Sequence, residues 1–548
     1  MSLRPGPSRR RVLGGACALA SAAFLAGCTW PGESEAQALA GLRFQAAAPL
    51  VLRDWNASTL PGNYRAPARG EVPLRAFTSG ERVVASYYFY WYNVNIGLHT
   101  QGACGALTLH PPTMKGFSTL NPSWHAQQMA DMHVAGIDVA LPVYWGNDTS
   151  LLWSQAGLQQ LVVALEAMDR EGMRHPQIGM FFDTTGLLEQ AGAPVDITVD
   201  PGRSMFLNYV RSFYSLVPPH ERALIDGHPI VWLYSAAFVS HYTQAAITAF
   251  AQDFAAEFGA TPYIVRENSW NIQSDDVYAW GAASNGPNFF GVLEVGPGFN
   301  NTALTCETHL IVHRRAGAFY RQSWDTALAH ASYGPLHHLA AVETWNELHE
   351  GTAVCQTAEY GRLYINLTRE YTDRFHRLGP IRPASGPYTH AISVSYTFGK
   401  PARAAGLTLL PQPDGPVTPS QVDGRWAGVT GHDSYGGNYI YLAVDPSFAY
   451  ETNAPFSVDV TYLDAGSGSF GVQYDSNLNV APFQGAYAGA EPGAVALTGA
   501  GTWQTARFSL PYANFGQREN GGAGFRVVAP GPGFAVAQII LRREPGGS

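Results

Sequence analysis

The sequence has little charge and few cysteines, and each shortage excludes a class of protein. Lys, Arg, Asp and Glu make up only 14% of the 548 residues, and the formal net charge is −9. No basic stripe runs through the body of the chain, which argues against a nucleic-acid partner. The five cysteines form neither a CxxC pair nor a metal-ligand spacing. We therefore expect no structural metal and no cofactor.

Glycine, proline and aromatic residues are plentiful instead. The chain contains 58 Gly, 37 Pro, 13 Trp and 27 Tyr. This loop-rich, aromatic composition is typical of carbohydrate-active proteins outside the cytoplasm and is unlike that of a disordered chain. The length is too great for one domain, so we expect two large domains and a tether. The length does not indicate an oligomeric state.

A long apolar run occurs only near the N-terminus. Arg9, Arg10 and Arg11 precede the apolar residues 12–26, and the run ends in Leu-Ala-Gly-Cys at Cys28. This pattern predicts a signal peptide over residues 1–27 with a lipobox, cleavage before Cys28 and lipidation of that cysteine. Ordinary secretion is the alternative. The segment also resembles a twin-arginine signal, so we expect an extracytoplasmic lipoprotein, anchored at the cell surface or in the periplasm by lipid alone.

The next segments alternate between strand-like and helix-like patterns. Residues 28–80 read as a tether and lead-in, and residues 81–378 as a (β/α)8 barrel of the TIM type, because eight short apolar runs are mostly followed by helical spacing. Two connections in the middle are too short for ordinary helices. The predicted strands cover residues 83–91, 137–145, 177–183, 229–235, 263–267, 277–280, 290–295 and 339–345. The predicted helices cover residues 121–135, 151–171, 204–216, 243–258, 318–331 and 360–377.

Period-two alternation replaces helical spacing in residues 379–548. Phe456, Val458 and Val460 exemplify it. Strands at this spacing, separated by Gly, Asp and Asn turns, predict an all-β sandwich. Rings such as Trp426 and Trp503 would let the sandwich bind carbohydrate, or they belong to a core that only braces the barrel.

The stretch AVETWNELHEGT (residues 341–352) concentrates the candidate chemistry. A buried strand is followed by Glu347 and Glu350, with His349 between them and Gly351 after them. Two carboxyl groups three residues apart share one pocket only if the chain bends after the strand. The C-terminal ends of barrel strands carry the active sites of such folds. Paired carboxylates ringed by aromatic residues indicate an acid and a base acting on a sugar.

This stretch resembles the catalytic phrase of glycoside hydrolase family 99, in which Trp-Asn-Glu is followed after two residues by Glu-Gly. Further similar phrases are SYYFYWYNV at Ser86, AGIDVALPVYWGND at Ala135, GHPIVWLY at Gly227, VGPGFNNT at Val295 and HRRAGAFYRQSWDTAL at His313. The resemblance implies a retaining endo-α-mannosidase or endo-α-mannanase acting through a 1,2-anhydro sugar. It makes Glu347 the base and Glu350 the acid. Leu348, where the family usually has an aromatic residue, puts the substrate in question.

Other polar and aromatic residues at the predicted strand ends are candidates for binding a polysaccharide or oligosaccharide. They are Tyr88, Tyr90, Trp91, Tyr144, Trp145, Asp148, Asp183, Glu267, Asn268, Trp280, Glu294, Asn300, Trp345, Asn346 and His349.

Several alternatives remain at this stage. A retaining glycosidase could use Glu294 as its nucleophile, or the protein could bind carbohydrate without catalysis. His309 and His313 lack a nearby third ligand, which argues against a metal there. In an oxidising compartment Cys104, Cys306 and Cys355 could form one disulfide. Cys306 and Cys355 are the preferred pair, because they follow neighbouring predicted strands.

Overall fold

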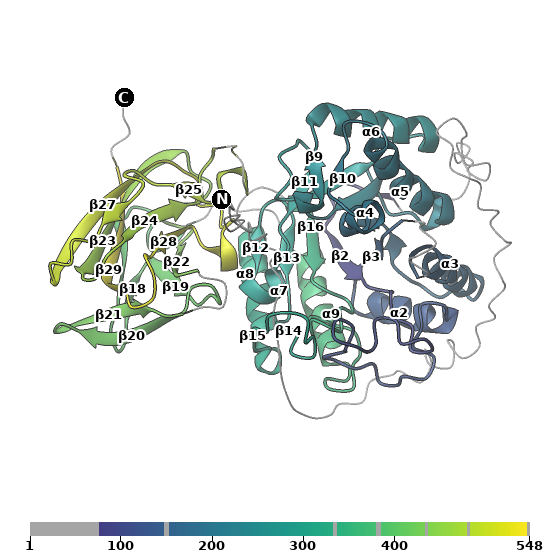
Figure 1. Cartoon of the computed structure of the whole chain (residues 1–548), viewed down its shortest axis with the longest axis horizontal. Helices are drawn as coiled ribbons and strands as arrows, with labels where there is room; N and C mark the ends of the chain where they lie inside the picture. Colours follow the sequence, from purple (N-terminus) through teal and green to yellow (C-terminus); the bar gives the residue numbers. More distant parts are fainter. Residues whose placement is uncertain are drawn as a thin grey trace, which may run out of the picture.

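Parallel strands organise the first of two groups of elements in the computed structural model. The structure describes residues 76–146, 153–332, 337–379, 385–432, 437–478, 480 and 483–544. Mixed α/β elements end before residue 380, and antiparallel strands follow from residue 385 (Figure 1). We call these the parallel domain (residues 76–379) and the antiparallel domain (residues 385–544). The predicted signal peptide, most of the tether, Cys28 and Asp148 lie outside the described residues.

One sheet of the parallel domain contains twelve strands among the described residues. Eight of them pair in parallel in a continuous order. Along the sheet these are β13 (Leu293–Val295), β16 (Leu339–Val342), β2 (Val83–Tyr88), β3 (Val139–Tyr144), β5 (Met180–Phe182), β8 (His228–Leu233), β10 (Tyr263–Glu267) and β11 (Asp276–Tyr278). All residues of β2, β3 and β16 are buried. Continuous apolar runs of this kind are typical of parallel strands covered on both faces.

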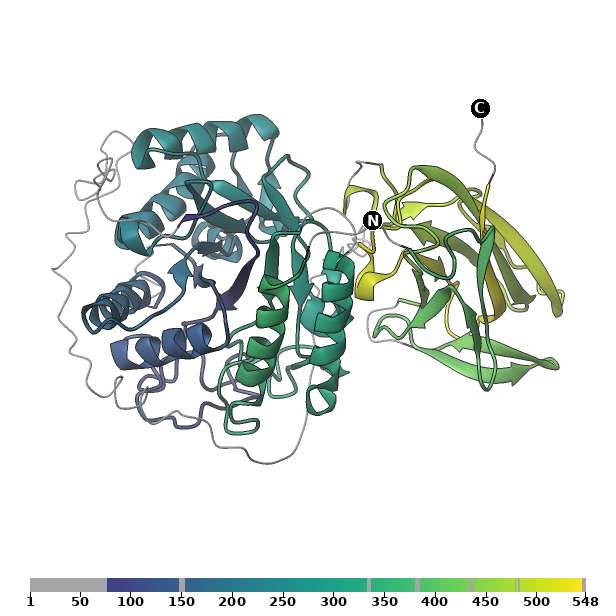
Figure 2. The same ribbon diagram turned by 180° about the vertical axis from the view of Figure 1, so that it is seen from behind.

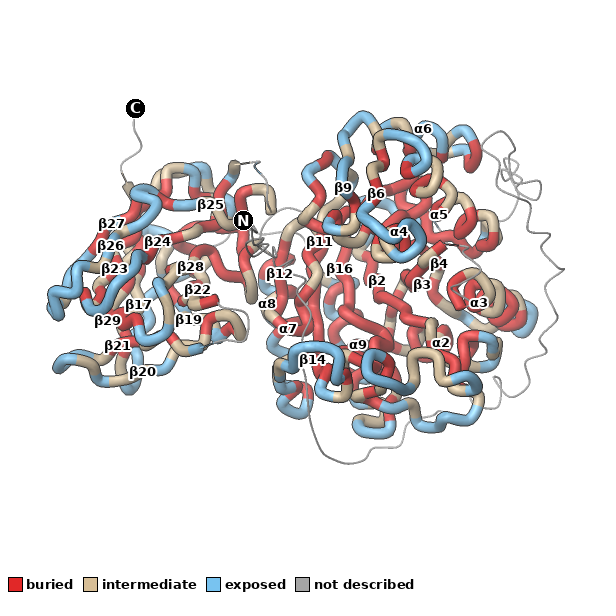
Figure 3. Tube along the Cα trace, in the orientation of Figure 1, coloured by how far each residue is buried: buried red, intermediate tan, exposed pale blue. Residues whose placement is uncertain are grey.

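Helices surround these strands, and the buried residues concentrate between the two layers (Figure 3). The helices are α2 (Pro122–Val134), α3 (Ser154–Arg170), α4 (Thr185–Ala191), α5 (Gly202–Leu216), α6 (Gln244–Phe258), α7 (Ala282–Asn285), α8 (Ala318–Ser332) and α9 (Leu363–His376). Helices α8 and α9 lie side by side, as the view from behind shows (Figure 2). The predicted helices are confirmed to within a few residues at their ends.

Local sequence explains where these helices begin and end. The Asn121 side chain caps α2 by accepting from the Ser123 N–H at 3.1 Å, and Pro122 supplies the first helical residue. The Thr243 hydroxyl accepts from the Ala246 N–H at 3.2 Å at the start of α6, which Gly259 ends in a left-handed conformation.

The two short connections predicted in the middle of the sheet are confirmed. Among the described residues no helix separates β10 from β11, and only the four-residue α7 and the antiparallel β12 (Asn288–Phe289) lie between β11 and β13. Strands β11 and β13 are not paired in the described part of the sheet. The N–H groups of Gly291 and Val292 both donate to the Val277 carbonyl at 2.9 Å, so the two sheet edges lie close together.

Short strands complete the parallel domain at its edges. They are β1 (Ala76–Phe77), β4 (Gln177–Ile178), β6 (Val195–Asp196), β7 (Leu224–Ile225), β9 (Val239–His241), β14 (Phe299–Asn300) and β15 (Ile311–Val312). Strands β14 and β15 form a small hairpin before α8. No described helix is both long and apolar enough to cross a membrane.

The antiparallel domain consists of two antiparallel sheets that share one hydrophobic core. The first sheet contains β17 (Ser393–Thr397), β18 (Arg403–Ala405), β20 (Val417–Val422), β21 (Arg425–Thr430), β23 (Ala454–Asp464), β27 (Thr502–Ala513) and β29 (Ala535–Arg543). The second contains β19 (Leu407–Leu410), β22 (Tyr439–Val444), β24 (Ser469–Tyr474), β25 (Ala488–Gly489), β26 (Val495–Ala496) and β28 (Phe525–Val528). Phe456, Val458 and Val460 point into this core, as their spacing predicted.

Candidate functional site

The chain turns directly after β16, the strand that precedes Glu347. The strand ends at Val342, three residues before its predicted end, and a turn occupies residues 348–351. The Thr344 hydroxyl accepts from the Glu347 N–H at 2.8 Å and lies 2.8 Å from the Thr352 hydroxyl. Gly351 has a φ of +63°, and a Cβ there would lie 2.8 Å from the backbone nitrogen of Asn300. Only glycine fits this position without strain.

Glu347 is buried in this turn with one carboxylate oxygen paired and the other not. Its side chain is about 4% exposed. Oε1 accepts from the His349 N–H at 2.9 Å and lies 2.7 Å from Nδ1 of the His349 ring. Oε2 is also buried and has no hydrogen-bond partner among the described residues. An unpaired buried oxygen of this kind is costly unless a bound group hydrogen-bonds to it.

His349 links Glu347 to the loop that carries His99. Its Nε2 lies 3.0 Å from the His99 carbonyl, which can only accept, so this nitrogen carries a proton. Burial lowers the pKa of His349, but Glu347 raises it through its charge and hydrogen bond, and the net pKa lies above the usual value. His349 therefore positions one oxygen of Glu347 and leaves the other oxygen available.

Trp345 and Asn346 attach the turn to neighbouring elements. The Asn346 side chain accepts from the Phe89 N–H at 2.8 Å and donates to the Phe89 carbonyl at 2.7 Å. The Trp345 indole donates to Gln128 of α2 at 2.8 Å. Both predicted binding residues thus make hydrogen bonds within the protein. These bonds fix the turn against the end of β2 and against α2.

A group of rings adjoins His349 and includes two of the predicted residues, Trp91 and Trp145. Trp91 stacks on His99 with 4.8 Å between ring centroids and lies 5.8 Å from His349. Trp145 lies 6.1 Å from Trp91, and its indole donates to Asp183 Oδ2 at 2.6 Å. Burial raises the pKa of Asp183. One contiguous set of side chains therefore extends from the Glu347–His349 pair through Trp91 and Trp145 to Asp183.

A second set of carboxyl groups lies further inside the parallel domain. The Tyr87 hydroxyl donates to Glu294 Oε1 at 2.6 Å, and the Tyr87 ring lies 4.9 Å from that of Trp280. Glu343 accepts from the N–H groups of Gly281 and Ala282 at 2.8 and 2.9 Å. Burial, and then the charge of Glu343, raise the pKa of Glu294 well above its usual range. Burial raises the pKa of Glu343 to about 7.

Three predicted tyrosines lie apart from Glu347, between the strands and the helices. The Tyr88 hydroxyl is 2.8 Å from His125 of α2, and the Tyr90 hydroxyl donates to the Ser154 carbonyl at 2.7 Å. The Tyr144 hydroxyl is 2.7 Å from Ser212 of α5. Successive residues of a strand point to opposite faces, so Tyr88 and Tyr90 cannot share a face with Tyr87.

The remaining predicted residues make local contacts. Glu267 accepts from the Ser269 N–H at 2.9 Å, burial raises its pKa, and the adjacent Asn268 is buried. The Asn300 side chain accepts from the Thr302 N–H at 2.8 Å, and its backbone N–H donates to the Glu350 carbonyl. Glu350 is half-buried in the turn, and its catalytic role stays a prediction.

Arg314 and Arg315 are predicted from the sequence to hold this loop or a carboxylate, and the structure shows Arg314 bonded to the turn. Its guanidinium is buried and donates to the carbonyls of Gly351 and Ala353, the latter at 2.8 Å. It also lies over the rings of Tyr360 and Tyr364. The particular partners of Arg314, two carbonyls and two tyrosine rings, have no local sequence signal, because the two carbonyls lie 37 and 39 residues away in the chain.

The predicted Cys306–Cys355 disulfide is wrong. Cys306 pairs with Cys104, with 5.4 Å between their Cα atoms, and Cys355 is a buried free thiol whose pKa burial raises. The Cys306 N–H also donates to the Ala103 carbonyl, so the two loops already run against each other. Strand adjacency does not place these loops, because the long loop that contains Cys104 also contacts the turn after β16, with the His99 carbonyl 3.0 Å from His349 Nε2.

Comparisons with known proteins place the parallel domain in a family. Residues 75–385 match the family model described as "Domain of unknown function (DUF5010)". No curated protein matches the chain. Similar solved structures include the GH99 endo-alpha-mannosidase from Bacteroides thetaiotaomicron, at 14% identity and a TM-score of 0.38, covering 54% of this chain and 98% of that one. A glycoside hydrolase-like protein covers 55% of this chain and 97% of its own, at 15% identity and a TM-score of 0.42. At these values the structural similarities carry no argument about the reaction.

Proposed function

The chain belongs to the DUF5010 family, whose function is unknown, and from its own residues we propose that it is a glycoside hydrolase. The observation that carries the proposal is the buried Glu347 carboxylate, which has one oxygen held by His349 and one without a partner. It follows a parallel strand, where α/β folds build their active sites. The adjoining Trp91 and Trp145 supply the rings on which a sugar can stack.

The proposed reaction retains anomeric configuration. Glu347 Oε2 removes the proton from the 2-hydroxyl of the sugar, whose oxygen attacks C1 and forms a 1,2-anhydro sugar. Glu350 protonates the departing glycosidic oxygen, and water then opens the anhydro ring with the two residues in reversed roles. Both the endo-α-mannanase-like substrate and this division of roles follow from the resemblance of residues 342–352 to glycoside hydrolase family 99.

Glu294 is the less suitable nucleophile. Burial and the nearby Glu343 raise the pKa of Glu294, which favours its neutral form, and its Oε1 accepts from Tyr87. A neutral carboxyl group is a poor nucleophile. A protein that binds glycans without cleaving them would hydrogen-bond this oxygen to a sugar hydroxyl just as well, so turnover is the property that separates the two functions.

The proposal includes the architecture and the location of the enzyme. The bonds from Gly291 and Val292 to Val277 support closure of the eight parallel strands into a (β/α)8 barrel. The signal sequence ending at Cys28 supports export and anchoring as a lipoprotein. We also propose that the antiparallel domain is a carbohydrate-binding module that binds sugars through its aromatic rings.

The test is digestion of a panel of α-mannans and mannooligosaccharides, with the anomer of the fresh product read by NMR. Glu347→Gln and Glu350→Gln are each expected to lower turnover by about 10²- to 10⁴-fold, the usual contribution of a general acid or base. Glu370→Gln, an exposed carboxylate of α9 paired with Arg321, is the control and should retain full activity.

Two results would contradict the proposal. Wild-type turnover by both the Glu347 and Glu350 variants would exclude the pair, and an inverted product would exclude the anhydro route. Glycan binding by a wild-type protein that cleaves no member of the panel would favour the non-catalytic alternative.

A further inference from the structure

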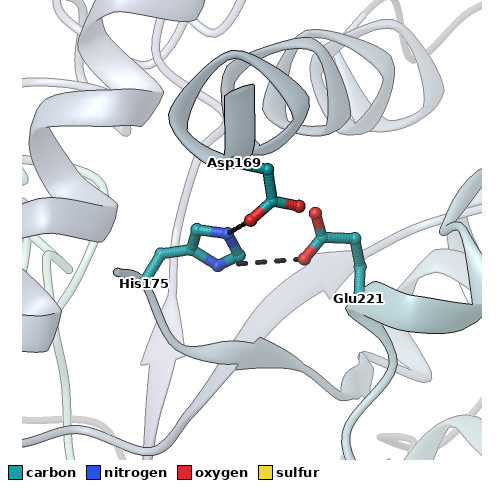
Figure 4. A group of neighbouring side chains, drawn as sticks. All are labelled: Asp169, His175 and Glu221. Carbon is teal, nitrogen blue, oxygen red and sulfur yellow. Dashed lines mark hydrogen bonds and ion pairs between the residues drawn. The ribbon is translucent and has the colours of Figure 1, made fainter. Parts of the chain in front are cut away.

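Three titratable side chains converge at the end of the parallel domain opposite to Glu347. Asp169 lies in the last turn of α3, His175 precedes β4 by two residues, and Glu221 ends the short helix η1 (Pro219–Glu221) before β7. One ligand atom from each lies within 4.8 Å of the others. The side chains point toward one another from three separate segments (Figure 4).

Glu221 brings a buried and unpartnered oxygen into this cluster. Its side chain is only 1% exposed, and Oε1 has no hydrogen-bond partner among the described residues. The carboxyl groups of Glu221 and Asp169 face each other (Figure 4). Two carboxylates in contact repel each other unless a proton or a cation lies between them. A proton or a bound cation between the two carboxyl groups therefore relieves this repulsion.

The His175 ring is oriented as a metal ligand would be. Its Nδ1 is 3.0 Å from the Pro176 carbonyl, which can only accept, so Nδ1 carries the proton. Nε2 lies 3.1 Å from Asp169 Oδ1, with a proton between them, and Nδ1 lies 3.8 Å from Glu221 Oε2. A metal ion bound to Nε2 would replace the proton on that nitrogen. Metal-bound histidines commonly donate their other ring N–H to a backbone carbonyl, which fixes the tautomer in the same way.

His220 provides a fourth candidate ligand on the solvent side. Its Nε2 lies 3.7 Å from Asp169 Oδ2 and 3.7 Å from Glu221 Oε1. The His220 side chain is about half-exposed, so it can move toward the carboxylates without disturbing the core. Water could fill the same position.

We propose that Asp169, His175 and Glu221 bind one divalent transition-metal ion of the zinc class, with His220 or water completing a four-coordinate site. Mixed imidazole and carboxylate ligands favour such ions, whereas Ca²⁺ and Mg²⁺ prefer sites built from oxygen alone. No metal is expected here from the sequence, because the residues are 6 and 46 positions apart and follow no metal-ligand spacing.

The site is structural and independent of the proposed glycosidase activity. It connects the end of α3 with the segments that lead into β4 and β7, all at the N-terminal ends of the strands. A β-bridge between Ile178 and Arg222 already joins two of these segments, and metal bound there would join the end of α3 to both. It would thereby raise the thermal stability of the folded chain.

The test uses the full chain without a histidine tag, treated with a chelator and then titrated with Co²⁺ or Zn²⁺ alone. We expect one equivalent of Co²⁺ to give visible absorption of a four-coordinate site, and Zn²⁺ to displace it. The Asp169 side chain is about half-exposed. We expect Asp169→Asn to weaken Zn²⁺ binding about 100-fold or more, as measured by calorimetry. Zn²⁺ should raise the Tm of the wild type by several degrees and leave that of Asp169→Asn unchanged.

Asp325→Asn is the matched control, since Asp325 is a similarly exposed helix residue paired with Arg374. It should bind Zn²⁺ as the wild type does. The proposal is overturned if the wild type binds no Co²⁺ or Zn²⁺. It is equally overturned if Asp169→Asn binds with wild-type affinity and stoichiometry, because the buried His330–His337 pair would then be the source of binding.

Discussion

At the scale of single residues, the turn around Glu347 depends on side chains that bond to the backbone. Asn346 pairs with both backbone groups of Phe89, and Thr344 accepts from the Glu347 N–H. Glu343 is held in the same way by two N–H groups before α7. Such bonds stabilise a fixed geometry because a buried polar group without a partner is costly. The one buried oxygen of Glu347 without a partner stands out against these satisfied neighbours.

Glu343 gives a pH dependence whose sign follows from its environment. Burial raises its pKa from 4.5 to about 7 in the folded chain. Between these values the folded state binds more protons than the unfolded state, so the contribution is fully present below pH 4.5 and is lost as pH rises through 7. Relative to Glu343→Gln, the wild type should lose about 3 kcal/mol of unfolding free energy between pH 4.5 and 8.

Urea unfolding of both proteins at a series of pH values measures this difference. Glu370→Gln, an exposed substitution, should follow the wild-type profile. Parallel profiles for the wild type and Glu343→Gln would show that the buried carboxyl group is not perturbed.

At the scale of elements, the order of strands and helices follows from their sequence patterns, and their boundaries follow from caps. Strand β10 has the predicted bounds, and α2 begins at Pro122 after its Asn121 cap. Strand β16 ends three residues before its predicted end. The N–H groups of Glu343 and Trp345 still donate to the Val295 and Tyr87 carbonyls at 2.9 Å, but their side chains bond to the start of α7 and to α2. The turn that follows is instead held by Arg314, which precedes α8.

Substitution of Arg314 tests this support. Arg314→Met should lower the free energy of unfolding by about 3 kcal/mol, because two buried carbonyls lose a charged donor. It should also lower glycan turnover if the turn holds the Glu350 side chain in its catalytic position. Urea unfolding and glycan digestion measure the two effects.

The adjacent Arg315→Met is the control. Arg315 is exposed, so its substitution should change stability by no more than about 0.5 kcal/mol. Equal effects of the two substitutions would show that the buried guanidinium does not hold the turn.

At the scale of the whole molecule, the two domains meet along α8 (Figures 1 and 2). His330 of α8 is fully buried, with Nδ1 3.1 Å from Gln517 Oε1 and Nε2 3.2 Å from the Tyr450 hydroxyl. Its ring also stacks on Phe289, 4.2 Å away. A buried histidine paired with groups of the other domain indicates a fixed interface, since separation would expose the ring and break its hydrogen bonds.

A chain ending at Gly379 should therefore be less stable than the parallel domain within the full chain. Phe289 and His330 would face water, so calorimetry should show a Tm lower by several degrees, whereas the full chain should unfold in a single transition. Two separate transitions in the full chain, one of them at the Tm of the shortened chain, would show that the domains are independent.

The sequence by itself determined the elements, their order, the change to antiparallel strands after residue 379 and the position of the glutamate pair after a buried strand. These features depend on residues close together in the chain, whose spacing and caps record local structure. The tertiary structure alone decided the Cys104–Cys306 pairing, the outward direction of Tyr88 and the convergence of Asp169, His175 and Glu221. Each depends on contacts between distant segments, which packing of the whole chain fixes and local spacing does not encode.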